Sequence, residues 1–562
     1  MGGAGRANAS LARQGLDERS RMTQFECLMQ LTRILSVAMV IGSACTARGA
    51  ATTTPRPISL DDCIQMALEH SLALRVQRLA PELARYALNG SYAAYDPSLS
   101  LAYQKNSSSS PGGVDPQARI FGSSETESDG LTGGLTGMLP TGLSYSLGTS
   151  TTDSYGFTPG AAPDYSKPTI VTNTFTDWLT GDTHTGWFVQ YTNMVQTRDP
   201  FERSTAWVGI QLSQPLLKNL WIDNARLSIT LAKKDLKRSE LGLEYAIMSK
   251  VADVINAYYL LIAAQEQVKV QETSLQWAEQ FLSETKKKVE VGVLAPLDEK
   301  QAEAQLEATR ADLMGARGDL TKAQNGLKAL LTDNYADWQN TEPQPTEKLS
   351  APVRVFNRAD SWQKGMTMRP DLKQLRIDLE KQRIHLRYDY NQLFPQLNLE
   401  GSYGMNGSGK EFSGALGNLQ DCSSPMYSFR AVLTFPLSNR AARYGYKASK
   451  ANVQQALLRL KEQEQFILLQ IDNAITTAAT SFARIGSTKQ ARVYAEAALA
   501  AEQKKLENGK STNFEVLLLQ RNLTSSLSTE LGALTTYNIA LAQLALSEGS
   551  ILEERGIKFE VK

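Results

Sequence analysis

Few residues in this sequence have the types and spacing that chemistry requires. The chain contains 3 His and 4 Cys among 562 residues. His70, His184 and His385 are far apart, and their spacing does not place two imidazoles on one helix face as metal ligands. Ser and Thr are abundant, but neither a nucleophile-elbow pattern nor a P-loop is present, so hydrolase and ATPase chemistry lack their sequence signatures. We therefore predict no enzyme activity, no metal site and no cofactor.

Two carboxylates occur in a repeated pattern. Asp298 follows Gly292 by six residues, and Glu515 follows Gly509 by six residues. A glycine at the end of a helix adopts a left-handed conformation easily, and an acid in the first turn of the next helix interacts favourably with the helix dipole. Both patterns predict a turn between two helices. This capping role explains the acids without catalysis.

The N-terminal region has the composition of an export signal. Arg33 precedes an apolar run at residues 34–41, and the small residues 42–44 follow it. Cys45 comes directly after them and is a candidate for lipidation, although the Leu that usually stands three residues before such a Cys is absent. We predict that residues 1–50 are an N-terminal extension and signal peptide, with simple cleavage favoured over lipidation.

Charge and hydropathy exclude two further classes. The 59 basic and 58 acidic residues nearly cancel, which removes the global electrostatic attraction that nucleic-acid binding uses. Apolar runs fall short of the roughly 20 residues that a membrane-spanning helix needs. The sequence therefore predicts neither a nucleic-acid partner nor a transmembrane helix.

An internal repeat organises the chain, and such a repeat is the first feature to seek in a long sequence. Pro97 precedes an alternating segment in the first copy, as Pro395 does in the second. Pro215 closes another alternating segment, as Pro436 does, and a long helical pattern follows each. The first pair of prolines is 298 positions apart and the second pair 221, so the first copy carries 77 extra residues.

The repeat sets the domain boundaries. We predict a first repeat at residues 51–342, a proline-marked linker at residues 343–357 and a second repeat at residues 358–562. The extra residues lie at residues 105–203, a tract rich in Ser, Gly, Thr and Asp that we interpret as a loop insertion. Alternating pieces such as residues 143–147 leave open an extension of the strands as a hairpin. Each repeat then consists of a helix, a strand, a loop, a strand, a long helix and a further helix.

Two long helical patterns dominate the sequence. Apolar residues recur every seven positions from Ile247 to Val289, which is a coiled-coil face. A seam with alternating spacings of three and four runs from Leu468 to Ile485 in the second repeat. The first long pattern covers residues 224–291, about 100 Å of helix, and the second covers residues 446–507. Such lengths indicate a tube or a rod.

Shorter helical runs accompany each long helix. Residues 60–95 and 295–331 are together long enough to match the first long helix end to end. Residues 359–394 and 513–549 do the same for the second. We predict a helical layer in which each long helix packs beside two stacked shorter ones.

The alternation of apolar and polar residues in the strand segments indicates strands with one face in contact with lipid instead of water. Residues 206–213 and 429–435 alternate between apolar residues on one face and small or polar residues on the other. A transmembrane β-barrel requires this alternation, and four such strands are too few to close a barrel with a polar lumen, so several chains must pool their strands. A soluble sandwich is the alternative that periodicity leaves open. Aromatic residues near the strands predict the interfacial belts of a barrel: Tyr103, Trp187, Tyr191, Trp207, Tyr403 and Tyr427.

With these features the sequence resembles the TolC family of outer-membrane efflux proteins from Ile58 to about Leu552. The resemblance rests on residues 59–68 before the first strand, on residues 212–216 after the second, and most specifically on the turns at residues 291–298 and 508–517. It implies a mainly α fold with a membrane β part. In that fold a tandem repeat forms a long coiled-coil α-helical barrel plus a shared transmembrane β-barrel, as a homotrimer.

The resemblance also implies roles for the two turns. They would form the periplasmic tip, where the channel narrows and a periplasmic adaptor docks, through Gly292, Val293, Leu297, Asp298, Gly509, Lys510 and Phe514. In the family the second turn usually carries two acids three residues apart that line the constriction. Here Glu515 occupies the first position and Leu518 the second. A trimer would then hold one ring of carboxylates instead of two, which weakens its attraction for cations.

We therefore expect an outer-membrane channel that extends into the periplasm of a Gram-negative-type bacterium. It would be a passive exit duct for substrates delivered by an inner-membrane transporter and a periplasmic adaptor, with outer-membrane lipid around its barrel. The alternative is a soluble periplasmic coiled-coil adaptor or scaffold protein. Such a protein would share the helices but lack lipid-facing strands.

Overall fold

The structure is a computed structural model that describes residues 54–114, 120–191, 194–422 and 424–557. The predicted signal peptide and Cys45 lie outside the described residues. The chain divides into two compact units. A small unit comprises Met1–Ser59 and Asn334–Thr346, and a large unit comprises Leu60–Asp333 and Glu347–Lys562.

The described part of the small unit is a two-stranded ladder. Strand β1 (Thr54–Ile58) pairs in parallel with β10 (Thr341–Pro345), and the 3-10 helix η2 (Tyr335–Trp338) precedes β10. The segment that we predicted to be a linker from residue 343 therefore begins inside a strand. Both strands of such a ladder are edge strands, where the missing N–H of proline is tolerated.

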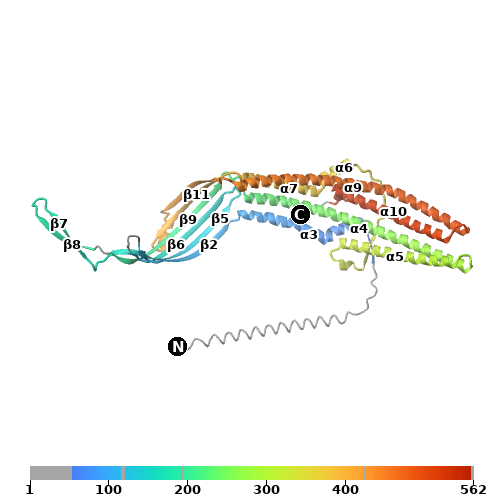
Figure 1. Cartoon of the computed structure of the whole chain (residues 1–562), viewed down its shortest axis with the longest axis horizontal. Helices are drawn as coiled ribbons and strands as arrows, with labels where there is room; N and C mark the ends of the chain where they lie inside the picture. Colours follow the sequence, from blue (N-terminus) through green and yellow to red (C-terminus); the bar gives the residue numbers. More distant parts are fainter. Residues whose placement is uncertain (1–53, 115–119, 192–193, 423, 558–562) are drawn as a thin grey trace, which may run out of the picture. The chain divides into compact units, whose positions relative to one another are not determined.

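The large unit contains two very long helices and a set of shorter ones (Figure 1). The long helices are α4 (Asn224–Glu290) with 67 residues and α9 (Arg440–Glu507) with 68, about 100 Å each. The shorter elements are α2 (Leu60–His70), α3 (Leu72–Ser91), η1 (Tyr92–Tyr95), α5 (Pro296–Leu331), α6 (Arg358–Met368), α7 (Pro370–Asn391), α8 (Phe412–Gln420), α10 (Asn513–Glu548) and α11 (Ile551–Glu554).

The helices form one layer in which α3 and α5 pack along α4, while α7 and α10 pack along α9. Because α4 also contacts α7 and α10, the order across the layer is α3 and α5, then α4, then α7 and α10, then α9. This arrangement confirms the predicted packing of each long helix beside two stacked shorter ones. The run predicted at residues 359–394 is divided between α6 and α7, because Pro370 disfavours a helical conformation at Arg369, whose ψ is 122°.

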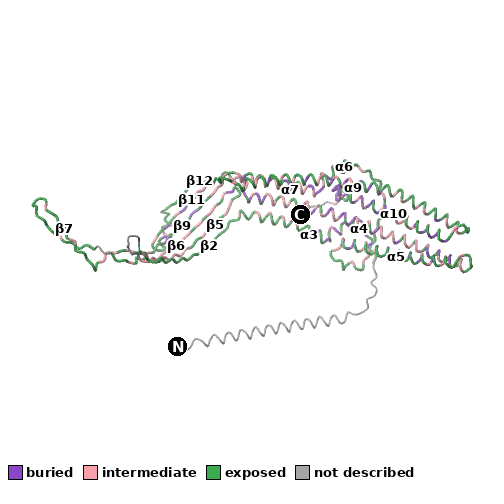
Figure 2. The backbone as a smooth tube through the Cα atoms, in the orientation of Figure 1, coloured by how far each residue is buried: buried purple, intermediate pink, exposed green. Residues whose placement is uncertain are grey.

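Buried residues follow the predicted seams of the long helices (Figure 2). The first four members of the heptad series are buried: Ile247, Val254, Leu261 and Val268. In the second repeat Ile471 and Ala478 are buried, whereas Phe482 remains 36% exposed. Helix α4 also contains a window that is apolar and long enough to cross a membrane by composition, and half of that window is buried inside the chain. Core helices of water-soluble layers have the same property.

The large unit also contains an antiparallel sheet of six strands in the order β12-β11-β9-β6-β5-β2. Its strands are β2 (Ser98–Ser110), β5 (Ser124–Met138), β6 (Ser144–Pro163), β9 (Met194–Pro215), β11 (Gln396–Gly409) and β12 (Pro425–Thr434). Two short ladders join β3 (Gly113–Val114) to β4 (Ile120–Phe121) and β7 (Thr169–Thr176) to β8 (Thr183–Gln190). Strand β9 leads into α4, and β12 leads into α9.

The tract at residues 105–203, which we interpret as a loop insertion, contributes strands β5 and β6 to this sheet. The hairpin extension that the alternating residues 143–147 left open is therefore present, since β6 begins at Ser144. Both strands consist mainly of Gly, Ser and Thr, whose small side chains give little contrast between alternate positions. The periodicity of the sequence was therefore weak. Pairing of β5 along the whole of β2, and of β6 along Met194 to Ser213 of β9, fixes the two strands in the sheet.

The two faces of the sheet differ in polarity. One row of directly paired residues crosses all six strands with apolar or aromatic side chains, none of them buried: Leu99, Leu135, Leu147, Ile210, Tyr403 and Tyr427. The adjacent row points to the opposite face and is polar throughout: Ser98, Thr136, Ser146, Gln211, Ser402 and Ser428. This is the apolar-out, polar-in alternation of a strand wall between lipid and water.

Three of the six aromatic residues predicted to form the belt do not lie on the apolar face of the sheet. Trp207 lies on the polar face together with Gly209 and Gln211, because side chains alternate along a strand. Its ring covers neighbouring glycines, since a Cβ on Gly148 would lie 2.8 Å from the ring and one on Gly209 would lie 2.7 Å from it. Trp187 and Tyr191 lie in and beside β8, outside the six-stranded sheet.

Candidate functional site: the two helical hairpin tips

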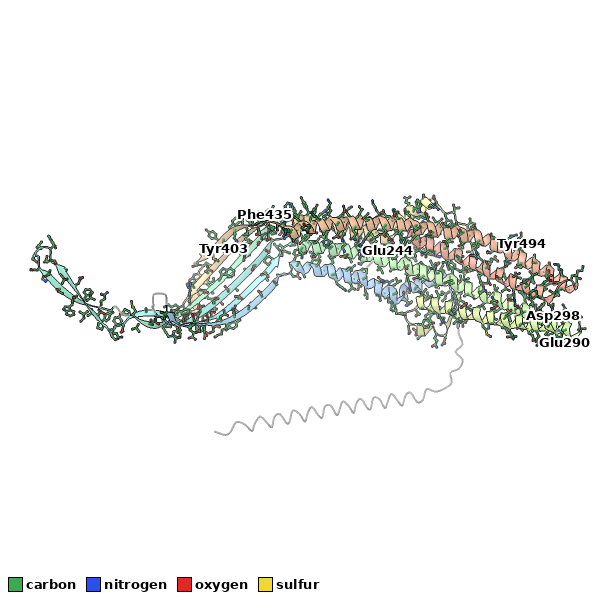
Figure 3. All side chains as sticks on the ribbon, in the orientation of Figure 1. Glu244, Glu290, Asp298, Tyr403, Phe435 and Tyr494 are labelled. Atoms are coloured by element: carbon green, nitrogen blue, oxygen red, sulfur yellow. The ribbon has the colours of Figure 1, made fainter. Side chains whose placement is uncertain are left out.

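The first tip joins α4 to α5. Gly292 has φ of +78°, the left-handed conformation that ends a helix. The N–H of Val293 donates to the carbonyl of Lys288 at 2.8 Å, which satisfies one of the last carbonyls of α4. Asp298 caps the start of α5, because its carboxylate accepts a hydrogen bond from the N–H of Ala295 at 3.1 Å. Figure 3 places Glu290 and Asp298 together at this end of the helices.

The second tip joins α9 to α10 with the same geometry. Gly509 has φ of +69°, and the N–H of Lys510 donates to the carbonyl of Lys505 at 2.8 Å. Thr512 and Glu515 form a capping box: the Glu515 N–H donates to Thr512 Oγ1 at 3.4 Å, and the Thr512 N–H donates to Glu515 Oε2 at 3.5 Å. The predicted capping chemistry of both turns is present.

A hydroxyl links two carboxylates at the second tip. Ser511 Oγ lies 2.5 Å from Glu502 Oε1 and 2.8 Å from Glu515 Oε2. A hydroxyl has one proton, so it donates to one of these carboxylates at a time. Hydrogen bonding from Ser511, and then from the ammonium group of Lys505, lowers the pKa of Glu502. This link was not predicted, although a Ser four residues before a Glu at a helix start is a signal for it.

Large apolar side chains are exposed at both tips. Val291, Val293 and Leu297 on the first tip, and Phe514 and Leu518 on the second, are between 46% and 78% exposed. Leu518 stands where the resemblance would place a second acid. Each tip therefore combines a carboxylate in a helix cap with apolar side chains that this chain leaves uncovered.

The two hairpins share a core close to their tips. Phe281 of α4, Ala302 of α5, Leu499 of α9 and Val516 of α10 belong to one buried apolar cluster. Polar contacts between the hairpins add to it, because Arg521 Nε donates to Gln305 Oε1 at 2.6 Å. The positions of the tips are therefore coupled within the chain.

The basic run at residues 286–288 is partly neutralised. The ammonium group of Lys286 lies 3.7 Å from Glu299 and 3.3 Å from Glu303, both on α5. Hydrogen bonds from Lys300 and then from Lys286 lower the pKa of Glu303. These pairs brace α4 against α5 next to the first tip.

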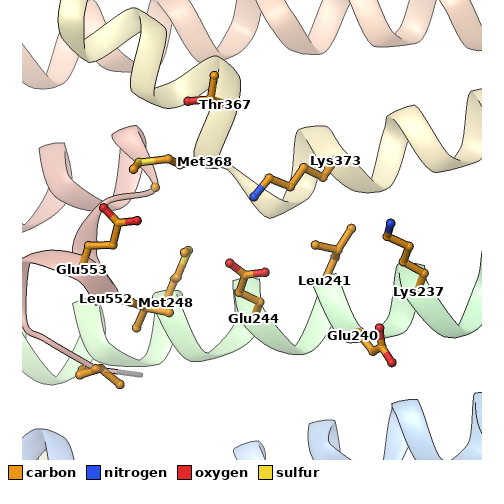
Figure 4. Close-up of a pocket in the computed structure, with 12 residues that line it drawn as sticks. Lys237, Glu240, Leu241, Glu244, Met248, Thr367, Met368, Lys373, Leu552 and Glu553 are labelled. Atoms are coloured by element: carbon orange, nitrogen blue, oxygen red, sulfur yellow. The ribbon is translucent and has the colours of Figure 1, made fainter. Parts of the chain in front are cut away.

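A cavity of about 470 Å³ lies between α4, α6, α7 and the chain after α10 (Figure 4). Glu244 points into it from α4, and Lys373 faces it from α7. Burial raises the pKa of Glu244, and the nearby ammonium of Lys373 partly offsets this effect. Glu244 has no distinctive signal in the sequence, because one acid three residues before the seam position Ile247 is ordinary spacing. The lining contains no nucleophile paired with a base.

Thiols and imidazoles do not assemble into a reactive centre in the described residues. His70, His184 and His385 lie on α2, β8 and α7, and no group of three or more His, Cys, Asp or Glu residues in the described ranges could hold a metal ion. Cys63 is a buried free thiol, and burial raises its pKa to about 12. Cys422 is a free, exposed thiol.

A family model described as outer membrane efflux protein matches residues 185–332 and 364–550, more than half of the chain. The chain belongs to the outer membrane efflux protein family. It is 21% identical to outer membrane protein TolC of Vibrio cholerae over 365 residues, which cover 63% of this chain and 79% of that protein. It is 23% identical to nodulation protein T of Rhizobium leguminosarum bv. trifolii, over 58% of this chain and 69% of that protein.

Solved structures agree on the fold of this efflux protein. The outer-membrane channel OprN superposes with a TM-score of 0.60 at 16% identity, over 87% of this chain and 90% of that one. The expectation of a mainly α, repeated fold with a membrane β part is confirmed. This efflux protein is an exit duct of the outer membrane that extends into the periplasm, and it is not an enzyme. The alternative of a soluble adaptor finds no support.

Proposed function

We propose that three copies of this efflux protein assemble head to tail into one closed channel. The channel would give passive exit to substrates that an inner-membrane transporter and a periplasmic adaptor deliver. The observation that carries the proposal is that the sheet and the helical layer are both open at the same two edges. One edge consists of α3 and β2, and the other consists of β12 and α9.

The α3 edge carries an apolar stripe that the chain leaves uncovered. Five residues at spacings of three and four are each more than half exposed: Leu72, Val76, Leu79, Leu83 and Tyr86. A helix of a water-soluble layer buries such a stripe against a neighbour. The exposed apolar residues of α9 include Tyr444, Leu458, Phe466 and Leu469. These two helices are the natural partners of each other between copies.

The two edges differ, so the edge of α3 and β2 in one copy would contact the edge of β12 and α9 in the next copy. Contacts of this heterologous kind generate a ring when the rotation between copies closes. The apolar face of the sheet would then contact outer-membrane lipid, and the polar face would line the lumen. A ring of three copies is the assembly that the family resemblance implies.

We assign the hairpin tips to adaptor docking. The residues are Gly292, Val293, Leu297, Asp298, Gly509, Lys510 and Phe514, which lie at the ends of the two hairpins. At each tip the helix caps hold the backbone in place, and apolar side chains beside them are exposed. Exposed apolar surface on a rigid backbone suits the docking of a partner protein. The shared core beneath the tips would let docking at one hairpin move the other.

We assign Glu515 to the pore constriction. Its carboxylate is exposed and is held by Thr512 and Ser511. Three copies would present one ring of three carboxylates, and Leu518 would form an apolar ring one helical turn further along α10. The same side chain therefore caps its helix and faces the lumen.

Membrane fractionation of the chain expressed with its own N-terminal region tests this proposal. Unheated detergent extracts run on gels should show trimers in the outer-membrane fraction, and planar bilayers should show a small, mostly closed conductance. Glu515→Gln should reduce cation preference, whereas Glu502→Gln, a neighbouring acid, should change it less. A soluble periplasmic monomer without conductance would contradict the channel assembly.

A further inference from the structure

Strands β5 and β6, which the first repeat has in addition to its two outer strands, raise the number of strands that each copy contributes to the wall of the barrel. Within the described residues the second repeat supplies β11 and β12 alone to this sheet, whereas the first supplies β2, β5, β6 and β9. All neighbours in the sheet are antiparallel and the number of strands is even. The edge strands β2 and β12 therefore run in opposite directions. A rotated copy of the chain can pair its β2 with β12 in the antiparallel sense that the rest of the sheet uses.

The added strands are part of the wall between lipid and water. In the apolar row that crosses the sheet, β5 contributes Leu135 and β6 contributes Leu147, directly between Leu99 of β2 and Ile210 of β9. In the polar row the same two strands contribute Thr136 and Ser146. A plug or an extracellular loop would not continue both rows in register.

We propose that three copies close a barrel of eighteen strands, with six strands from each copy and β2 of one copy paired to β12 of the next. This inference rests on the three-copy assembly proposed above. Strand number fixes barrel diameter in a roughly linear way, so this barrel would be about 1.5 times as wide as one with four strands per copy. Barrels of this size contain an aqueous channel. The narrow point of the duct is then at the hairpin tips.

The ends of the edge strands define their register. Strand β2 begins at Ser98 directly after η1, and β12 ends at Thr434 shortly before α9, so both ends adjoin helices. Placing Ser98 opposite Thr434 of the next copy sets Leu99 opposite Leu433 and Tyr103 opposite Phe429. These four side chains are all exposed and apolar or aromatic. The apolar faces of two copies then join without a break.

Disulfide trapping tests this register on the polar face. Ser100→Cys combined with Val432→Cys, in a Cys422→Ser background, places two thiols on directly opposed residues, whose Cβ atoms are about 5 Å apart in such pairs. Oxidation should convert most chains into covalent dimers and trimers on heated, non-reducing gels. The matched control, Ser100→Cys with Ser428→Cys, shifts one thiol four residues along the same face. It should form few or no such bonds.

The control makes the outcome decisive. The register is wrong if disulfides form efficiently in the control pair and not in the test pair. The pairing of β2 with β12 is wrong if neither pair forms disulfides although trimers persist on unheated gels. Absence of trimers in the unsubstituted protein would instead contradict the proposed assembly.

A deletion tests the strand number. Asn106, Ser128, Ser154 and Arg203 lie in one row of the sheet. Replacing residues 107–202 by an Asn-Gly turn would therefore join β2 to β9 in register and leave four strands per copy. Electron microscopy of the detergent-extracted trimers should show a barrel about two-thirds as wide as that of the full chain.

A smaller deletion is the matched control for this experiment. Replacing residues 164–193 by the same turn joins Pro163 to Met194, which already pair, and removes only β7 and β8. Its barrel should keep the full width. Equal widths for the full chain and the four-strand variant would overturn the eighteen-strand barrel. If the variant with the larger deletion fails to assemble, the barrel widths of the full chain and of the control variant are measured directly. A width that corresponds to twelve strands would then overturn the proposal.

Discussion

The helical layer and the sheet place their apolar residues on opposite sides. In the helices the heptad positions such as Val254 are buried between neighbours, and few charged side chains are buried, among them Arg369 and Glu548. In the sheet Leu99 and Tyr427 are more than 70% exposed, while the paired Ser and Thr rows occupy the other face. The exposed surface of the helical layer therefore suits contact with water. The apolar face of the sheet suits contact with lipid, and its polar face suits a water-filled lumen. Substitutions of the same kind should have different consequences in the two regions.

The largest effect is expected in the helical core. Leu372 of α7 is fully buried against residues of α9 such as Ile467. Leu372→Ala should lower the free energy of unfolding by about 2–5 kcal/mol, because it removes apolar contacts and leaves a cavity. Leu99→Ala on the sheet should cost less, since lipid or detergent fills the space. Thermal unfolding of the purified assembly measures both, and equal losses would contradict the difference between the regions.

A charge on the sheet should discriminate between its faces. Leu101→Arg places a guanidinium on the apolar face of β2. Such a charge costs about 2–4 kcal/mol at the middle of a bilayer and less towards its edges. Ser100→Arg, one residue away, points to the polar face and should be tolerated. The amount of heat-sensitive trimer recovered from outer membranes reports the effect. Similar recovery of both variants would show that the two faces were assigned wrongly.

The helix caps give a smaller and more local effect. Thr512→Ala should destabilise the start of α10 by about 1 kcal/mol, because the Glu515 N–H loses its acceptor. At the first tip Ala295 occupies the equivalent position and offers no side-chain acceptor, so Ala295→Thr should stabilise α5 by a similar amount. Hydrogen exchange of the first-turn amides measures both changes. Unchanged exchange in both variants would mean that tip stability does not depend on these caps.

The smallest effect should come from Glu244. Burial raises the pKa of this carboxyl, so the folded chain binds its proton more tightly than the unfolded chain does. The contribution of Glu244 to stability should therefore improve as pH falls through the raised pKa towards the ordinary value, and worsen as pH rises. Glu244→Gln should remove this dependence and stabilise the chain slightly at neutral pH. A pH series of unfolding midpoints, with Glu290→Gln at an exposed position of the same helix as the control, measures it.

The long helices and their turns could be predicted from the sequence because their signals are local. Helix α4 begins at the predicted residue and ends one residue before the predicted end. Gly292 and Gly509 adopt the expected left-handed conformations, and Asp298 and Glu515 cap the expected helices. The hydroxyl bridge from Ser511 to Glu502 was not predicted, because it joins a turn to the preceding helix across nine residues.

The strands of the first repeat required the tertiary structure. Apolar and polar residues alternate clearly in β9 and β12. In β5 and β6 small residues predominate, so the alternation at residues 143–147 left a hairpin as an open alternative, and pairing with β2 and β9 decides it. The same holds for Pro343, which a local rule assigns to a linker and which parallel pairing with β1 places in a strand.

The sequence by itself determined the two-fold repeat, the helical layer and the capped turns, because periodicity and helix-end chemistry depend on residues close together in the chain. Only the tertiary structure decided how many strands form the wall, which glycines Trp207 covers and which edges remain open. Hydrogen bonds between strands join residues that are far apart in the sequence, and small side chains leave the register of those strands to the backbone.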